Sequence, residues 1–327
     1  MRIPARGLAL AAVLAALAVA ALMFGEPFVG VNRLLPALTA DGGIEHVVVA
    51  HARAPRVVLA LAAGAALGVA GLLLRESLRN PLAVPELLGV STGAAAAVTV
   101  CVVFGITVPG APTIPALAGA VAGGVLTLLA VRRAVGPAAT LLIGAAVSAA
   151  LQAVLLAAHA MSDSRDQGVL VRYLLGSLTG TGWAGVGAVA VGLLVTFPLA
   201  VLTIPVLGAL RLGDDTALGI GVRADRARPA VLLVACGLVA VVVAHCGPVA
   251  WVGFLAPHLA QAVVPRGDLR LGMAWSASFG AVLVLAADTL ARTLLYPVEL
   301  PVGGLTAVVA VAAGAALAAS RRRTVLA

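Results

Sequence analysis

The sequence contains no lysine, and all 21 of its basic residues are arginine. A P-loop uses a lysine to reach the terminal phosphates of a nucleotide, so this chain carries no Walker-type ATPase of its own. A lysine Schiff base is excluded on the same ground. Any ATP-driven process that involves this protein therefore needs a second chain to hydrolyse the nucleotide.

Charged residues are also scarce, at 10% of the 327 residues, whereas soluble globular proteins have about 25%. Hydrophobic residues make up 62%, and the mean hydropathy is +1.14. These proportions exclude intrinsic disorder and indicate lipid as the main solvent. The net charge of +8 does not indicate nucleic acid, because membrane proteins concentrate arginine in their cytoplasmic loops. We expect a lipid membrane around this chain and no nucleic-acid partner.

The three cysteines form no recognisable site. Cys101 and Cys236 lie in apolar runs, and Cys246 follows His245 without further ligands at a metal-binding spacing. The sequence has no Cys-x-x-Cys pair, so it predicts neither a disulfide framework nor a zinc site. The remaining polar residues offer no nucleophile with a matching base. We therefore expect no enzyme, no bound metal and no cofactor held by this chain.

Ten apolar stretches predict an all-α polytopic membrane protein, since about 20 residues are needed for each crossing. The expected helices are 8–25, 57–74, 88–106, 114–131, 138–160, 185–207, 229–246, 250–264, 273–294 and 303–320. The first stretch could be a signal peptide, but it lacks a clear small-x-small cleavage site before Gly25. We therefore expect an uncleaved first membrane helix and a single transmembrane domain over residues 1–327.

The arginines set the expected orientation. With ten crossings and a cytoplasmic N-terminus, fifteen arginines fall on the cytoplasmic side and six on the outside. This asymmetry follows the positive-inside rule and predicts that both termini are cytoplasmic. The pairs Gly64/Gly68 and Gly119/Gly123 place small residues on single helix faces, which favours close helix packing within the subunit or between subunits.

The most polar segment is the inner loop 209–228. Asp214 is a favoured N-cap and Asp215 suits a helix N-terminus, whereas Gly219 and Gly221 are natural helix stops. The pattern predicts a helix of about two turns outside the membrane. Its apolar edge would consist of Ala217, Leu218 and Ile220. Such a helix either docks in a groove of another protein or rests on the bilayer, and the residues alone favour neither.

A second inner element follows the second predicted helix. Asn80-Pro81 and Pro85 interrupt any helix in this segment, and Arg79 precedes them. Taken alone, the segment is a connector that carries a positive-inside arginine.

On the outer side, Arg53 and Arg56 lie three residues apart at a helix start. An exposed pair of cations there suits acidic groups on a partner, although solvated interfacial arginines are an equally simple interpretation. Asp288 lies about a turn inside the outer boundary, and Arg292 follows it on the same helix face. An intramembrane carboxylate is a functional candidate. We interpret these two as a neutralising structural pair and keep proton coupling through Asp288 as the alternative.

Together these segments resemble the FecCD family, the membrane permeases of ABC importers for iron–siderophores, haem and vitamin B12. Residues 53–56 are similar to the family's R-x-P-R, and 79–90 to its R-N-P-L-A-x-P-x-L-L-G-V. Residues 212–222 are similar to its coupling-helix signature L-G-D-E-x-A-x-x-L-G-V. The resemblance continues in order through Leu175-Gly176-Ser177-Leu178, Gly247-Pro248, Pro257-His258 and Glu299-Leu300-Pro301-Val302-Gly303.

The resemblance implies a permease of the type II ABC importer kind in the bacterial plasma (inner) membrane. It implies a dimer with a second copy or a paralogue, with the path along the subunit interface. Two ABC ATPase subunits would use the ATP and would contact the coupling helix at Asp214 to Val222. An extracytoplasmic substrate-binding lipoprotein would meet Arg53, Arg56 and Arg292 on the outer face.

The resemblance implies a metal chelate as substrate, and we expect a ferric siderophore. Haem and cobalamin permeases share these motifs, and the apolar helices do not name a ligand. The sequence departs from the family pattern in three places: Gln261 stands where arginine is frequent, Asp268 is not followed by His-Arg, and the last helix lacks the usual Gly-x-Pro-x-Phe over residues 307–319. The competing function is a proton-coupled secondary transporter that works alone and uses Asp288.

Overall fold

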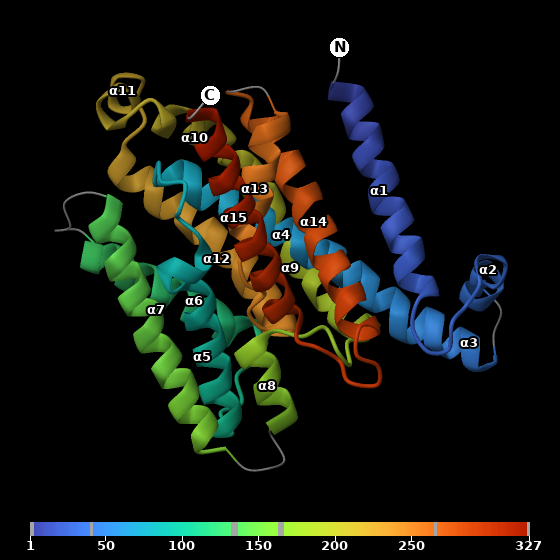
Figure 1. Cartoon of the computed structure of the whole chain (residues 1–327). Coiled ribbons are helices and arrows are strands. Elements are labelled where there is room, and N and C mark those ends of the chain that lie inside the picture. The colour runs from blue at the N-terminus through green and yellow to red at the C-terminus, as the bar shows by residue number, and fades with distance from the viewer. Residues whose placement is uncertain (1–2, 40–41, 132–136, 163–166, 265–266, 326–327) are drawn as a thin grey trace.

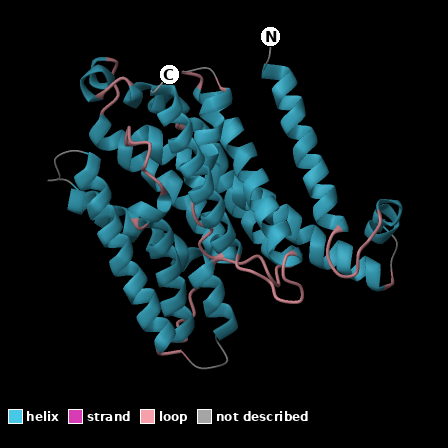
Figure 2. Ribbon diagram, in the orientation of Figure 1, coloured by secondary structure: helices cyan, strands magenta, loops and turns pink. Residues whose placement is uncertain are grey.

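The computed structural model of this chain describes residues 3–39, 42–131, 137–162, 167–264 and 267–325. These residues form helices and connecting loops without any β-strand, which confirms the all-α class (Figure 2). The elements are α1 Ile3–Met23, α2 Val31–Thr39, α3 Ile44–His46, the π-helical η1 Val47–Arg53, α4 Ala54–Ser77, the 3-10 turn η2 Pro85–Leu88, α5 Val90–Val103, α6 Thr113–Val131, α7 Pro137–Ala160, α8 Gln167–Leu175, α9 Trp183–Leu202, α10 Ile204–Arg211, α11 Asp214–Gly219, α12 Ala224–Cys246, α13 Val252–Val263, α14 Leu269–Thr293 and α15 Val302–Val325.

Seven helical stretches in the described part of the chain are long and apolar enough to cross a membrane. Three shorter apolar helices, in α5, α13 and α15, accompany them. Each of the ten expected segments overlaps one of these helices. The number of crossings and the side on which the termini lie stay predictions.

The second expected helix begins earlier than the sequence suggested. The segment 26–56, between the first two expected helices, contains α2, α3 and η1, and helical structure runs unbroken from Ile44 to Ser77. Pro55 did not stop the helix, because it lies in the first turn of α4 and follows a π-helical turn. Proline is tolerated in a first turn, and a π-bulge accommodates a local break in the hydrogen-bond ladder.

The expected helix 185–207 is divided in two. α9 ends at Leu202, and α10 begins at Ile204 with Pro205 in its first turn. A proline in the helix interior removes a hydrogen bond to the preceding turn, so a new helix starts with the proline in its tolerated position. The short α10 then leads into the inner loop.

Helix α4 lies at the centre of the bundle and packs against α14, α12, α13 and α9. Most of its residues are buried, including Leu59, Leu67 and Leu73. A helix that is apolar around its whole circumference is typical of a bundle interior. The other elements are arranged around α4, as Figure 1 shows.

Glycines allow the closest helix contacts. A Cβ atom at Gly64 of α4 would overlap the carbonyl group of Gly280 in α14, and one at Gly71 would overlap Gly253 in α13. In lipid, such small residues let helix backbones approach closely and gain van der Waals contact. The expectation of tight glycine packing within the subunit therefore holds at Gly64.

The two ends of the bundle carry different elements. The start of α1, the end of α15 and the short α11 lie at one end, which we call the α11 end (Figure 1). The start of α4 lies at the opposite end, which we call the Arg56 end. Helix α1 stands apart from the bundle at the α11 end and approaches α4 and α14 at the Arg56 end.

Candidate functional site

At the α11 end, an ion-pair cluster holds α11 against its neighbours. Asp214 accepts hydrogen bonds from Arg228 of α12 at 2.6 and 2.8 Å and from Arg79 at 3.2 Å. The bonds from Arg228 are the main cause of a pKa of Asp214 below its ordinary value. Arg228 also donates to the carbonyl oxygen of Ser77 at 3.1 Å, in the last turn of α4. The cluster therefore joins α11 to the end of α4 and the start of α12.

This geometry corrects one prediction. Asp214 is the first residue of α11 rather than its N-cap, and Gly213 occupies the N-cap position with φ of 103°. The carboxylate of Asp214 is bound by arginines and caps no backbone amide of α11. Positive φ is costly for residues with a Cβ, so glycine suits the position.

Helix α11 presents an apolar edge to the outside. Ala217 is buried against the bundle, whereas Leu218 and Ile220 are 61% and 60% exposed. Asp215 is exposed as well, the helix ends at Gly219, and Gly221 follows with φ of 87°. Large exposed apolar side chains on a braced helix outside the spanning helices are typical of a docking surface.

The connector between α4 and α5 folds back into the bundle. The side chain of Asn80 is buried and accepts a hydrogen bond from the amide of Leu82 at 3.0 Å, which forms an Asx turn around Pro81. Pro85 then opens η2 and lies in close contact with Gly253 at the start of α13. The motif is thus a folded inner element and not a simple surface connector.

Glu86 is a functional candidate that the sequence interpretation missed. Its Oε1 accepts a hydrogen bond from the amide of Trp251 at 3.3 Å, and its Oε2 is buried without a hydrogen-bond partner among the described residues. Trp251 precedes α13 and has φ of 64°, which is rare for a bulky side chain. The carboxylate therefore caps α13 from a separate element. Only its place directly after Pro85 could have drawn attention to it.

At the Arg56 end, a network centred on the buried residues Arg56 and Asp288 joins four segments. Arg56 Nε donates to both oxygens of Asp288, at 2.9 and 3.0 Å, and its Nη1 donates to Glu299 at 2.9 Å. Glu299 also accepts a hydrogen bond from the hydroxyl of Thr179 at 2.5 Å, in the loop after α8. The network thus connects α4, α14, the loop before α15 and the loop after α8.

The expected pairing of Asp288 with Arg292 was incomplete. Arg292 Nε lies 4.0 Å from Asp288 Oδ2, whereas Arg56 holds the carboxylate at hydrogen-bond distance. Asp288 is 1% exposed. A carboxylate fixed by two arginines is a poor proton carrier, so this geometry does not favour the secondary-transporter alternative.

The expectation of exposed outer arginines was wrong. Arg53, Arg56 and Arg292 are all buried. Arg53 donates to the carbonyl oxygens of Leu22 and Met23 at 2.8 and 3.1 Å, and Arg292 donates to that of Ala21. The last carbonyl groups of a helix have no partners within the helix and carry partial negative charge, so these two arginines cap α1.

The three arginines nevertheless share one cavity. A cavity of about 230 Å³ at the Arg56 end is lined by Arg53, Arg56, Arg292 and Val48, among others. Arg56 Nη2 and Arg292 Nε are buried without a hydrogen-bond partner in the described structure. Two donors of the arginine cluster are therefore unsatisfied beside this cavity, whose lining also includes Glu26 and Glu299.

Two of the three departures from the family pattern have local roles. Gln261 accepts a hydrogen bond from Arg75 at 2.5 Å, which joins α13 to the end of α4. Asp268 is the N-cap of α14 and accepts from the amide of Leu271 at 2.9 Å. Both residues are therefore satisfied within the subunit.

The FecCD transport family matches residues 13–318. This chain belongs to the FecCD transport family.

The relatives of this FecCD protein are permeases. It is 35% identical over 311 residues to the Fe(3+)-citrate import system permease protein YfmE of Bacillus subtilis, covering 92% of this chain and 91% of the relative. It is 36% identical over 263 residues to the ferric enterobactin transport system permease protein FepG of Escherichia coli, covering 79% and 78%.

The fold of this FecCD protein is also known from a solved structure. The match has a TM-score of 0.79 and 26% identity, and it covers 97% of this chain and 99% of that chain. That structure is described as an inward-facing conformation of an ABC transporter assigned to the metal-chelate type. The FecCD protein is thus an integral membrane permease subunit of an ABC importer, and a separate subunit hydrolyses the ATP.

Proposed function

We propose that this FecCD permease forms, with a second permease subunit, the path by which a ferric siderophore crosses the bacterial inner membrane. The α11 end would face the cytoplasm, where separate ATPase subunits dock. A binding protein would deliver the chelate at the Arg56 end. The names of the relatives support iron chelates as the substrate class.

The observation that carries this proposal is the bracing of α11. Asp214 fixes α11 to Arg79 after the end of α4 and to Arg228 near the start of α12. A partner that grips Leu218 and Ile220 and then moves would shift both spanning helices through these ion pairs. ATP-driven closure of the ATPase subunits would therefore change the tilt of α4 and α12 and alternate the access to the path.

Co-purification with the ATPase subunit tests this proposal. In Leu218→Arg, a charge is placed on the exposed edge of α11, and we expect the ATPase to be lost in mild detergent. Ile106→Arg is the matched control, because Ile106 is an exposed apolar residue in the loop after α5, at the opposite end of the bundle. If the wild-type permease fails to retain the ATPase, or Leu218→Arg retains it fully, the docking surface is wrong.

We infer further that an acidic side chain of the binding protein enters the cavity beside Arg53, Arg56 and Arg292. Charge reversal of these buried arginines would damage the fold, so it is a poor test of docking. Val48→Trp would fill the cavity without removing an arginine. Its neighbour Val47 is exposed and does not line the cavity, so Val47→Trp is the control.

The affinity of the binding protein for the reconstituted permease is the measurement. We expect Val48→Trp to weaken docking at least tenfold, because a desolvated charge-assisted contact contributes about 1.5 to 3 kcal/mol. Val47→Trp should leave the affinity unchanged. Equal affinities for both variants and the wild type would place the docking site elsewhere.

A further inference from the structure

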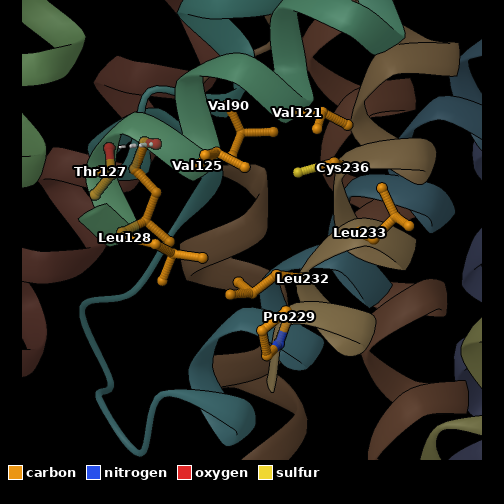
Figure 3. A pocket seen from close by; sticks show the side chains of 11 residues that line it. Val90, Val121, Val125, Thr127, Leu128, Pro229, Leu232, Leu233 and Cys236 are labelled. Carbon is orange, nitrogen blue, oxygen red and sulfur yellow. Dashed lines mark hydrogen bonds between the residues drawn. The ribbon is translucent and has the colours of Figure 1, made fainter. Parts of the chain in front are cut away.

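A second cavity, of about 180 Å³, lies between α6 and α12 and is separate from both sites described above (Figure 3). Side chains from the two helices face each other across it: Val121, Val125 and Leu128 from α6, and Leu232, Leu233 and Cys236 from α12. Leu88 of η2 and Val90 at the start of α5 also line it. Its lining is almost wholly apolar.

The cavity has no polar group that needs water. The one hydroxyl in its lining, that of Thr127, donates a hydrogen bond to the carbonyl oxygen of Leu88 at 2.9 Å. An apolar cavity of comparable size, about 150 Å³, stays dry and takes up benzene. A hydrocarbon segment is therefore the favoured occupant.

The cavity opens on the surface of two spanning helices. Val125 and Leu233 in its lining are 44% and 56% exposed. Both lie on stretches that are apolar and long enough to cross a membrane. The surface around the opening would thus contact lipid chains.

An exposed arginine, Arg226, lies in the first turn of α12, on the α11 side of the cavity-lining residues of that helix. At 100° per residue, Arg226 projects within about 20° of Leu233 on α12. Arg223 is paired with Asp225, and Arg228 with Asp214. Arg226 is exposed and forms no ion pair with any described residue. Asp225, the acidic residue next to Arg226 in the sequence, is thus already paired.

We propose that this cavity and Arg226 form a phospholipid site in the leaflet at the α11 end. One acyl chain occupies the cavity, and the lipid phosphate binds the guanidinium of Arg226. Because Leu88 and Val90 line the cavity, the bound chain packs against the start of α5 and the connector. The lipid would thereby brace the same connector that carries Glu86.

Native mass spectrometry of the purified permease tests the site. The permease in mild detergent is incubated with dioleoyl-phosphatidylglycerol or with the matching diacylglycerol, which lacks the phosphate. We expect the wild type to retain one phosphatidylglycerol per chain and to bind the diacylglycerol about fivefold more weakly, since one arginine near a lipid surface contributes on that scale.

Two variants separate the chain from the head group. A Cβ at Gly124 would meet Cys236 Sγ at 3.4 Å, an ordinary contact, so Gly124→Leu should fill the cavity and abolish retention of both lipids. Arg226→Gln should lower phosphatidylglycerol binding to the level of the diacylglycerol. The controls are Gly187→Leu, at an exposed glycine of α9, and Arg270→Gln, at an exposed arginine of α14.

Several outcomes would overturn the proposal. The wild type could retain no lipid, or it could bind phosphatidylglycerol and diacylglycerol equally. The control variants Gly187→Leu and Arg270→Gln could also lose as much lipid as the two site variants. If Gly124→Leu changed the dissociation of the permease dimer while the lipid count stayed constant, the face would be a subunit contact. If Arg226→Gln retained phosphatidylglycerol at the wild-type level, Arg226 would not be the group that binds the lipid phosphate.

Discussion

Arg56 holds Asp288 through a single nitrogen, with Nε placed 2.9 and 3.0 Å from the two carboxylate oxygens. The same guanidinium reaches Glu299 through Nη1. The central helix α4 is thereby joined to α14 and to the loop that leads into α15. Because Asp288 is almost fully buried, its negative charge is compensated by the neighbouring arginines Arg56 and Arg292.

Asp288→Asn should destabilise the permease severely. Removing one partner of a buried pair leaves uncompensated charge and costs about 3 to 5 kcal/mol. We expect a large fall in the unfolding midpoint in detergent. The double variant Arg56→Gln, Asp288→Asn should regain part of the loss, because it removes both charges.

The exposed pair Arg33–Glu45 is the matched control. Its N–O distance is 2.6 Å, but a solvated pair contributes less than about 1 kcal/mol, so Arg33→Gln should change little. Equal midpoints for Asp288→Asn and Arg33→Gln would show that the buried pair is not structural. Loss of uptake without loss of stability would return attention to proton coupling.

The sequence predicted the elements that have local signals. The apolar stretches and the small helix after Gly213 follow from composition, helix stops and charge placement within a few residues. The Arg56–Asp288 pair could not be predicted in this way, because its members are 232 positions apart and the nearer Arg292 offered a plausible helical neighbour. Sequence spacing favours partners on the same helix, such as Arg292. In the fold, Arg56 of another helix, α4, lies closer to Asp288.

The outer arginines show the same limit. A cation at a helix start normally reaches solvent, so Arg53 was expected to be exposed. In the fold, the end of α1 comes to lie beside it, and its carbonyl groups take the guanidinium. Which helix end a side chain will meet depends on tertiary packing, and no local pattern carries that information.

Gly280→Ala should disrupt the contact between α14 and α4. A Cβ at Gly280 would overlap the carbonyl group of Gly64, so the backbones must separate. Overpacking of this kind costs about 1 to 3 kcal/mol. Gly272 is on the same helix and has no atom near its Cβ position, so Gly272→Ala should be neutral or stabilising. The measurement is the thermal unfolding midpoint of both variants. An unchanged midpoint for Gly280→Ala would contradict the close packing of α14 against α4.

Asp214 predicts a pH dependence at the α11 end. Hydrogen bonds from Arg228 lower the pKa of Asp214 below its ordinary value of 3.8. A depressed folded-state pKa stabilises the fold above the unfolded pKa, and this contribution is lost as the pH falls through the folded value. The difference in unfolding free energy between wild type and Asp214→Asn should therefore be full at pH 7 and shrink below about pH 4.

The size of that difference should be modest, about 1 kcal/mol, because the Asp214 side chain is half exposed. Asp215→Asn is the control for loss of a carboxylate at this helix start, since Asp215 is exposed beside Asp214 and forms no ion pair with any described residue. A pH-independent difference for Asp214→Asn would mean that the arginines do not hold the carboxylate in solution.

Glu86 should be needed to form the start of α13. Glu86→Leu removes the acceptor for the amide of Trp251, at a point where the backbone of Trp251 already has positive φ. Loss of a helix cap costs about 0.5 to 2 kcal/mol. Glu86→Gln keeps one acceptor oxygen, so its stability should be close to that of the wild type.

Hydrogen exchange at the first amides of α13 measures the effect of Glu86 directly, because uncapped amides exchange faster. If both variants exchanged at the wild-type rate, the contact between η2 and α13 would not depend on Glu86. If Glu86→Gln alone blocked transport while its exchange stayed slow, the unpartnered Oε2 would have a role beyond capping.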